Sequence, residues 1–223
     1  MNIRNEVKDF GYWQFISYPS VYNPERLKEP KDIDELIKKS EVNLLGWNLP
    51  HTDLSGNASN FMSGRQSYTI WKEFIEGYRA YLSGLLLWQR VFIEDTKSYN
   101  VGGKLVIDFI RTIRYVTEIL NFLCRYYINF IKEGEIIIEI FLKNIMGRQI
   151  FTVNPILDIR KNFYISKESD FHFKKIITFL DLKIHWQEIA KEIIRKIFLI
   201  FNAEDISIKV ITDWQKKILT RSI

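Results

Sequence analysis

Residues 68–95 (YTIWKEFIEGYRAYLSGLLLWQRVFIED) constrain the fold of this chain most, because aromatic and aliphatic residues fill both sides of Ser83-Gly84. Glycine supplies the positive φ that tight hairpin turns need, so Ser83-Gly84 predicts a two-residue turn between two antiparallel strands. Such a turn would place Arg79 opposite Trp88. The stretch therefore predicts a β-hairpin.

Side chains alternate between the two faces of a strand, so this hairpin has one face for the core and one that mixes arginines with aromatic rings. Arginines beside rings on a sheet can stack on nucleic-acid bases or pack against a protein partner. The plainer alternative is that this second face lies under a helix, with the arginines reaching to its rim. The expected core face holds Phe74, Tyr78, Ala80, Leu82, Leu85, Leu87, Val91 and Ile93, and the second face holds Ile75, Arg79, Tyr81, Leu86, Trp88, Arg90 and Phe92.

A helix is the alternative for the same stretch, because its apolar residues also follow i, i+3, i+4, i+7 spacing. Gly77 and Gly84 would each cost a helix about 1 kcal/mol relative to alanine. The many rings also suit a pleated surface. The hairpin is the favoured prediction. The residues that fit the helical spacing are Trp71, Phe74, Ile75, Tyr78, Tyr81, Leu82 and Leu85.

Hydrophobic periodicity elsewhere predicts an α+β fold, in which an antiparallel β-sheet is packed by two long amphipathic helices, with short helices near the ends. The length of 223 residues suits a single domain over 1–223, or two halves at 1–100 and 101–223. The start of the longest predicted helix also carries the signal for a strand. The predicted strands are 12–18, 44–47, 135–143, 148–153, 171–177 and 206–211, and the predicted helices are 32–42, 105–131, 181–202 and 212–219.

Composition favours a cytoplasmic protein without a membrane segment. A single cysteine, Cys124, excludes an intramolecular disulfide and a cysteine zinc cluster. The N-terminus lacks the pattern of a signal peptide, and the apolar segments are short or interrupted by charge. The net charge of +5 is uneven, with −1 on residues 1–100 and +6 on 101–223. A basic C-terminal half can face phosphate, although solubility alone also explains such a charge.

Motifs for catalysis, metals or cofactors do not emerge from the sequence. His185 and Glu188 are spaced for one helix face, but di-iron sites need further pairs on other helices. Gly102-Gly103-Lys104 lacks the spacing of a phosphate-binding loop. We therefore expect no metal site, no cofactor and no catalytic residue. A divergent enzyme, with its site in residues 48–67, stays open as an alternative.

Residues 48–67 (NLPHTDLSGNASNFMSGRQS) form the longest stretch without periodicity, and loops of this length are either functional or disordered. The stretch begins within Gly46-Trp47-Asn48-Leu49-Pro50-His51. With Gly11-Tyr12-Trp13 and the hairpin, these residues resemble a family of uncharacterised bacterial proteins. That family has an aromatic N-terminal strand, a Gly-Trp-x-x-Pro-His element, a long loop and a Trp-rich hairpin. The resemblance covers about the first 95 residues, and it implies a bacterial protein without implying an activity.

Three hypotheses of function follow. The favoured one is a non-catalytic cytoplasmic binding protein that contacts nucleic acid, or a complex bound to nucleic acid, through the hairpin and the basic C-terminal half. The second is a protein-interaction subunit of a larger bacterial assembly, with a protein partner or a second copy of itself. The third is the divergent enzyme. The candidate binding residues are Trp47, His51, Asp53, Arg65, Arg79, Tyr81, Trp88 and Arg90.

Overall fold

The computed structural model describes residues 10–44, 46–51, 58–71, 74–96, 103–152 and 164–221. Its strands are β1 (Tyr12–Pro19), β2 (Ser59–Phe61), β3 (Gly64–Trp71), β4 (Phe74–Tyr81), β5 (Leu86–Val91), β6 (Val106–Asp108), β7 (Glu135–Lys143), β8 (Gln149–Phe151) and β9 (Phe171–Thr178). Its helices are α2 (Pro30–Ser40), α3 (Phe109–Ile128), α4 (Phe179–Ile200) and α5 (Ile208–Thr220), with a short 3₁₀ helix at Ile93–Asp95.

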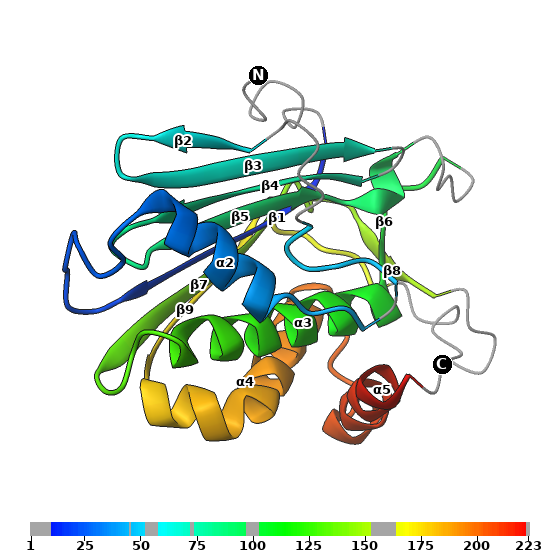
Figure 1. Ribbon diagram of the computed structural model, residues 1–223. Helices are drawn as coiled ribbons and strands as arrows, with labels where there is room; N and C mark the ends of the chain where they lie inside the picture. The colour runs from blue at the N-terminus through cyan, green and yellow to red at the C-terminus, as the bar shows by residue number, and fades with distance from the viewer. Residues whose placement is uncertain are drawn as a thin grey trace.

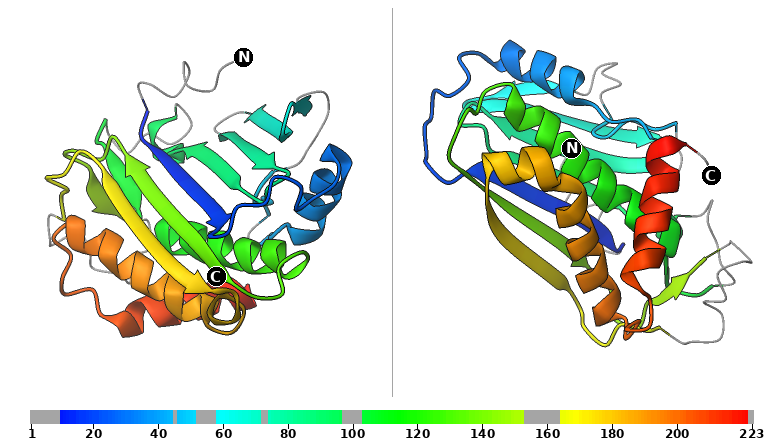
Figure 2. Two further views of the ribbon diagram at one scale, coloured as in Figure 1. Left: turned by 90° about the vertical axis from the view of Figure 1, so that its left-hand side faces the viewer. Right: turned by 90° about the horizontal axis from the view of Figure 1, so that it is seen from below.

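Seven of the strands form one antiparallel sheet in the order β2-β3-β4-β5-β1-β7-β9, and β6 and β8 form a small parallel pair. Helices α2 to α5 lie on one side of the large sheet (Figures 1 and 2). This arrangement confirms the predicted α+β class, with two long amphipathic helices, α3 and α4, packed on an antiparallel sheet. None of the helices within the described ranges is long and apolar enough to cross a membrane.

Strand β1 joins the two halves of the chain, because it pairs with β5 on one side and with β7 on the other. Helix α3 lies between the sheet and its neighbours α2, α4 and α5, so its residues are buried around most of its circumference. Asp108 caps its start by accepting a hydrogen bond from the backbone N–H of Arg111 at 2.7 Å. The core therefore fills the space around α3, under the middle of the sheet.

The hairpin of β4 and β5 is confirmed, but its predicted register is wrong. Ala80 pairs with Leu86, and the N–H of Tyr81 donates to the carbonyl of Leu85 at 2.8 Å, so the loop has three residues. Its last residue, Gly84, has φ of 86°, which is the bulge position of a three-residue hairpin. A shift of one residue turns every side chain of the second strand to the other face. Leu86, Trp88 and Arg90 therefore face the helices, and Leu87 faces away from them.

Residues 44–47 and 48–67 differ from their predictions. Residues 44, 46 and 47, the described part of this range, belong to no strand; the nearest pairing described is an isolated bridge between Val42 and Leu49. The supposed loop of 48–67 contains β2 and the first half of β3, which extend the sheet beyond β4. The sequence pattern did not predict these strands because it contains many polar residues and glycines. Both strands lie toward the edge of the sheet, where side chains meet solvent, so alternation of apolar and polar residues is not required.

In the C-terminal half, one prediction is confirmed and one is wrong. The strand predicted at 148–153 is present as β8, which pairs in parallel with β6. The strand predicted at 206–211 belongs mostly to α5, whose cap is Ser207, with its hydroxyl accepting from the N–H of Val210 at 3.3 Å. Thr212 therefore lies inside the helix and does not begin it. The β-branched residues of this segment are tolerated because the helix buries Ile211 against the core.

Candidate functional site

The predicted site residues separate into different parts of the structure. Arg79 and Tyr81 lie on the side of the sheet away from the helices, so the alternative that a helix covers this face is wrong for these two residues, and Arg79 is exposed. Arg65 lies on the helix side, where its Nε donates to Asp34 of α2 at 2.9 Å. Asp53 falls outside the described residues. The other four, Trp47, His51, Trp88 and Arg90, lie on the helix side around β4 and β5.

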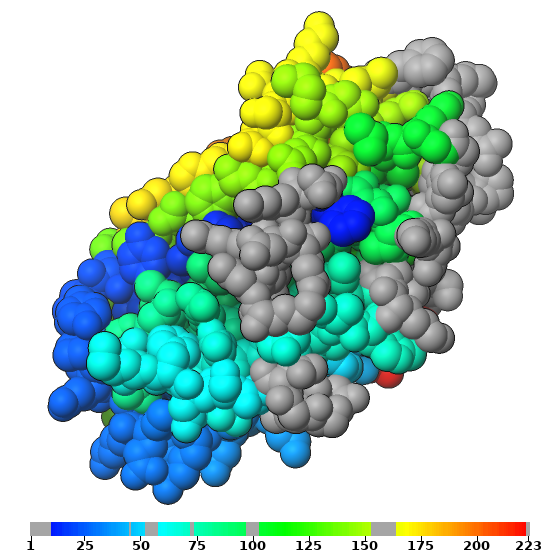
Figure 3. Space-filling model, turned by 90° about the horizontal axis from the view of Figure 1, so that it is seen from above, coloured from blue at the N-terminus to red at the C-terminus, as the bar shows by residue number. Residues whose placement is uncertain are grey.

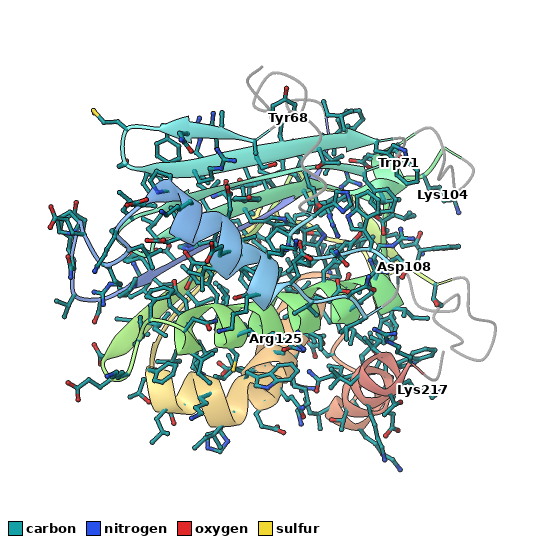
Figure 4. The ribbon with its side chains drawn as sticks, in the orientation of Figure 1. Tyr68, Trp71, Lys104, Asp108, Arg125 and Lys217 are labelled. Carbon is teal, nitrogen blue, oxygen red and sulfur yellow. The ribbon has the colours of Figure 1, made fainter. Side chains whose placement is uncertain are left out.

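The side of the sheet opposite the helices, which we call the open face, carries exposed and half-buried side chains (Figure 3). Figure 4 shows Tyr68 of this face pointing away from the helices. Strand register arranges the face in two rows that run across six strands. One row is Gln66, Arg79, Leu87, Ile16, Glu139 and Lys174, and the other is Tyr68, Gly77, Gln89, Gln14, Phe141 and His172.

Polar contacts order both ends of the open face. At one end, the Nε of Arg79 donates to the Oε1 of Gln66 at 3.0 Å. At the other end, Glu139 bonds His172 at 3.0 Å and Lys174 at 3.3 Å, and the ring of His172 stacks on Phe141 at 4.2 Å. Burial opposes ionisation of Glu139, but these hydrogen bonds prevail and lower its pKa.

A second cluster lies in the interior, between the sheet and α3, and we call Glu76, Arg90, Arg114 and Glu118 the buried charge cluster. Glu76 and Arg90 form an ion pair in which the Nε of Arg90 donates to Glu76 at 2.6 Å, and both side chains are at most 2% exposed. Glu76 also accepts from the indole N–H of Trp47 at 3.1 Å and from the backbone N–H of His51 at 3.0 Å. The Gly-Trp-x-x-Pro-His element thus contacts this cluster.

Arg114 and Glu118 form the second half of the cluster, one turn apart on α3. Their closest atoms, Nε and Oε2, are 3.4 Å apart, and the Glu118 side chain is completely buried. Burial raises the pKa of Glu118, although Arg114 and Arg90 partly offset this effect. Burial would lower the pKa of Arg90, but its carboxylate neighbours and Tyr115 raise it. The guanidinium groups of Arg90 and Arg114 each lie about 5 Å from the ring of Tyr115.

Buried side-chain atoms without a hydrogen-bond partner concentrate around this cluster. Native interiors contain few such atoms, because each one loses its bonds to water without replacement. Those found within the described ranges are atoms of Ser40, His51, Ser67, Thr69, Trp88, Arg90, Arg114, Tyr115, Glu118 and Tyr126. The Arg90 Nη2, Arg114 Nε and Glu118 carboxylate atoms among them still lie in the ion pairs described above. The whole set comes from α2, β3, β5, α3 and the segment that ends at His51, so its members share one side of the sheet.

Aromatic rings stack beside the buried charge cluster. The ring of Trp47 lies between His51 and Phe74, with both centroids at 3.9 Å and nearly parallel planes. Trp71, half exposed at the end of β3, stacks at 5.5 Å from Trp47 (Figure 4). The rings therefore connect the buried charges to the surface at this end of the sheet.

Metal chemistry finds no support in the part of the chain that is described, since no three His, Cys, Asp or Glu residues there are grouped to hold an ion. His185 has non-helical backbone angles within α4, so it departs from the regular spacing to Glu188. Cys124 is half-buried, and burial raises the pKa of its thiol.

Sequence reasoning missed four residues of this region, Glu76, Arg114, Tyr115 and Glu118. A helix with one apolar stripe usually turns its charged residues to solvent, so periodicity gives no reason to expect Glu118 in the interior. Only the packing of α3 between the sheet and other helices buries that side. The i, i+4 spacing of Arg114 and Glu118 was the one available signal.

Comparisons of this chain with protein-family models, with curated proteins and with solved structures find no match. The charged and aromatic groups described above are therefore the basis on which a function can be assigned.

Proposed function

We propose that the protein is a non-catalytic, cytoplasmic binding protein that holds single-stranded nucleic acid on the open face of its sheet. One observation carries this proposal: within the described part of the chain, the helices lie on the other face, and the open face places cations and aromatic rings in adjacent rows. Proteins hold single strands in this manner, with cations along the phosphates and rings against the bases. Of the basic residues in 101–223, Lys174 contributes a cation to this face, whereas Lys183 and Lys209 lie on the helix side.

The two rows suit a nucleic-acid strand that runs across the β-strands of the sheet. Tyr68 lies next to Gly77, which has no side chain to cover the ring. Phe141 lies in the same row four strands further on, about 19 Å away at the usual strand spacing. Between them, the amides of Gln89 and Gln14 bond each other at 2.7 Å and can also bond base edges.

The proposal changes the roles given to the hairpin residues. Arg79 and Lys174, both exposed, contact phosphate, and Tyr68, Tyr81 and Phe141 stack on bases. Trp88 and Arg90 have no part in it, because the register buries them on the other side.

Fluorescence anisotropy with labelled single-stranded RNA, single-stranded DNA and duplex DNA tests the proposal, each titrated from low to physiological salt. Single strands should bind most tightly, and binding should fall with salt. Arg79→Ala with Lys174→Ala should weaken binding at least tenfold and reduce the salt slope by about two. The matched control is Lys183→Ala with Lys209→Ala, which removes two exposed cations from the helix side and should change affinity less than twofold.

Absence of binding at low salt would overturn the proposal, as would equal losses in the two double variants. A protein partner is the second candidate, because half-buried aliphatic residues, Ile16, Leu87 and Ile137, occupy the middle of the open face. Complex formation that survives high salt and is lost in Leu87→Arg would favour it.

A further inference from the structure

The strand β9 forms one end of the seven-stranded sheet, and in the described part of the chain it pairs with β7 alone. Figure 2 shows β9 at this edge, with α4 beneath it. Natural edge strands are often short or broken by proline or a bulge, because unpaired main-chain groups recruit other strands. At the opposite edge, β2 has three residues. β9 has eight, without proline or glycine, and its register with β7 runs without a bulge, so its outer edge is suited to pair with a further strand.

The register identifies the main-chain groups on this outer edge. The N–H of Phe179 donates to the carbonyl of Gly134 at 2.8 Å, one position beyond the pair of Thr178 and Glu135. Hydrogen-bonded and non-hydrogen-bonded pairs alternate along an antiparallel ladder, so every second residue of β9 turns its N–H and C=O away from β7. Within the described ranges, no strand beyond β9 pairs with these outward groups. They belong to His172, Lys174 and Ile176.

Lysines flank the middle of this edge and outnumber the carboxylates that pair with them. On the helix side, Glu192 pairs with both Lys175 and Lys196. On the open face, Glu139 pairs with Lys174. The side chains of Lys174 and Lys196 remain 49% and 50% exposed. The edge can therefore receive further carboxylates on both sides of the sheet.

We propose that the outer edge of β9 binds an extended segment of a partner protein that carries acidic side chains. The segment adds a strand to the sheet, so main-chain hydrogen bonds supply affinity, and carboxylates beside the lysines supply specificity. A second copy of the chain fits less well, because both copies would bring the same lysines to the contact, and like charges opposite each other destabilise a strand pair. The proposal does not depend on nucleic-acid binding, and its tests leave Arg79 and Lys174 unchanged.

Fluorescence anisotropy of the full chain with the labelled peptide acetyl-Val-Glu-Glu-Val-Thr-Glu-Glu-Val-amide tests the proposal. Adjacent glutamates of an extended peptide lie on opposite faces, so this peptide presents carboxylates to both sides of the edge. We expect a Kd below about 1 mM at low salt. A peptide with lysine in place of each glutamate loses the charge, and an acidic peptide N-methylated along its length loses the main-chain donors. Each should bind at least tenfold more weakly.

Ile176→Pro is the variant that tests the main-chain contact, because it removes an outward N–H and no bond to β7, and edge strands tolerate proline at such a position. It should weaken binding of the acidic peptide at least tenfold. Ile176→Ala is the matched control, since it shortens the same exposed side chain but keeps the N–H, and its affinity should stay within about fivefold of the wild type. Lys175→Ala with Lys196→Ala should weaken binding at least fivefold, and Lys183→Ala with Lys209→Ala, on other parts of the helix side, less than twofold.

The proposal is overturned if the acidic peptide does not bind at about 1 mM, or if the lysine or N-methylated peptide binds as tightly. It is also overturned if Ile176→Pro folds and binds the acidic peptide as Ile176→Ala does. If Ile176→Pro does not fold, the N-methylated peptide decides the question on the wild type. Sedimentation of the wild type at rising concentration tests the other occupant: a dimer that Ile176→Pro abolishes would assign the edge to a second copy and overturn the acidic partner.

Discussion

The ion pair of Glu76 and Arg90 should be one of the most sensitive points of the fold, and Glu76→Gln tests this expectation. The two side chains are 2% and 1% exposed, and Glu76 accepts hydrogen bonds from Arg90, Trp47 and His51. The variant keeps the shape of the side chain but leaves the Arg90 charge buried without its closest counter-charge. Breaking a buried pair in this manner costs about 3–5 kcal/mol.

The comparison is Asp34→Asn, which breaks the pair of Asp34 and Arg65. Those side chains are 29% and 20% exposed, so water screens the pair, and a loss of about 0.2–1 kcal/mol is expected. For a chain of this length, about 2–4 °C of melting temperature correspond to 1 kcal/mol. Glu76→Gln should therefore lower the melting temperature by about 6–20 °C, and Asp34→Asn by about 4 °C at most.

Urea unfolding followed by tryptophan fluorescence measures both losses. The double variant Glu76→Met with Arg90→Met should recover most of the stability, because apolar residues of similar volume can replace a buried ion pair. If Glu76→Gln costs no more than Asp34→Asn, the reasoning that the buried pair is unscreened is wrong. If the double variant is as unstable as Glu76→Gln, the loss arises from packing and not from charge.

Three further predictions concern single residues. Gly84→Ala should destabilise the protein by about 1–2 kcal/mol in thermal unfolding, because φ there is 86° and the added Cβ would lie 2.8 Å from the ring of Phe130; an unchanged melting temperature would contradict the bulge geometry. Asp95→Asn should cost about 3–5 kcal/mol in urea, because Arg148 donates two hydrogen bonds to this buried carboxylate at 2.6 and 2.5 Å; a loss below about 1 kcal/mol would place the pair with screened surface pairs. Burial raises the pKa of Glu118 above 4.5, so the folded state keeps a proton that the unfolded state loses. The stability that this bound proton contributes is complete below pH 4.5 and is lost as the pH rises through the folded-state pKa of Glu118. The free energy of unfolding of the wild type, relative to that of Glu118→Gln, should therefore fall over that range.

The sequence by itself determined the class of fold and most of its regular elements. Clean alternation predicted β7, and apolar residues at helical spacing predicted α3 and α4, because each of these elements turns an apolar face or stripe toward a common core. Local patterns suffice where one side of an element faces the core.

Tertiary structure alone decided the register of the central hairpin and, with it, the candidate site. Ser83-Gly84 allows a loop of two or three residues, and nothing local distinguishes them when both faces of β5 carry apolar side chains. Packing against α3 selects the loop that buries Trp88 and Arg90, where Glu76 balances the charge of Arg90. Glu118 is buried for the same reason, because residues far apart in the chain enclose α3. The periodicity of a sequence predicts which one side of an element is buried. Whether a charged side chain can be buried depends on which groups the complete fold places beside it.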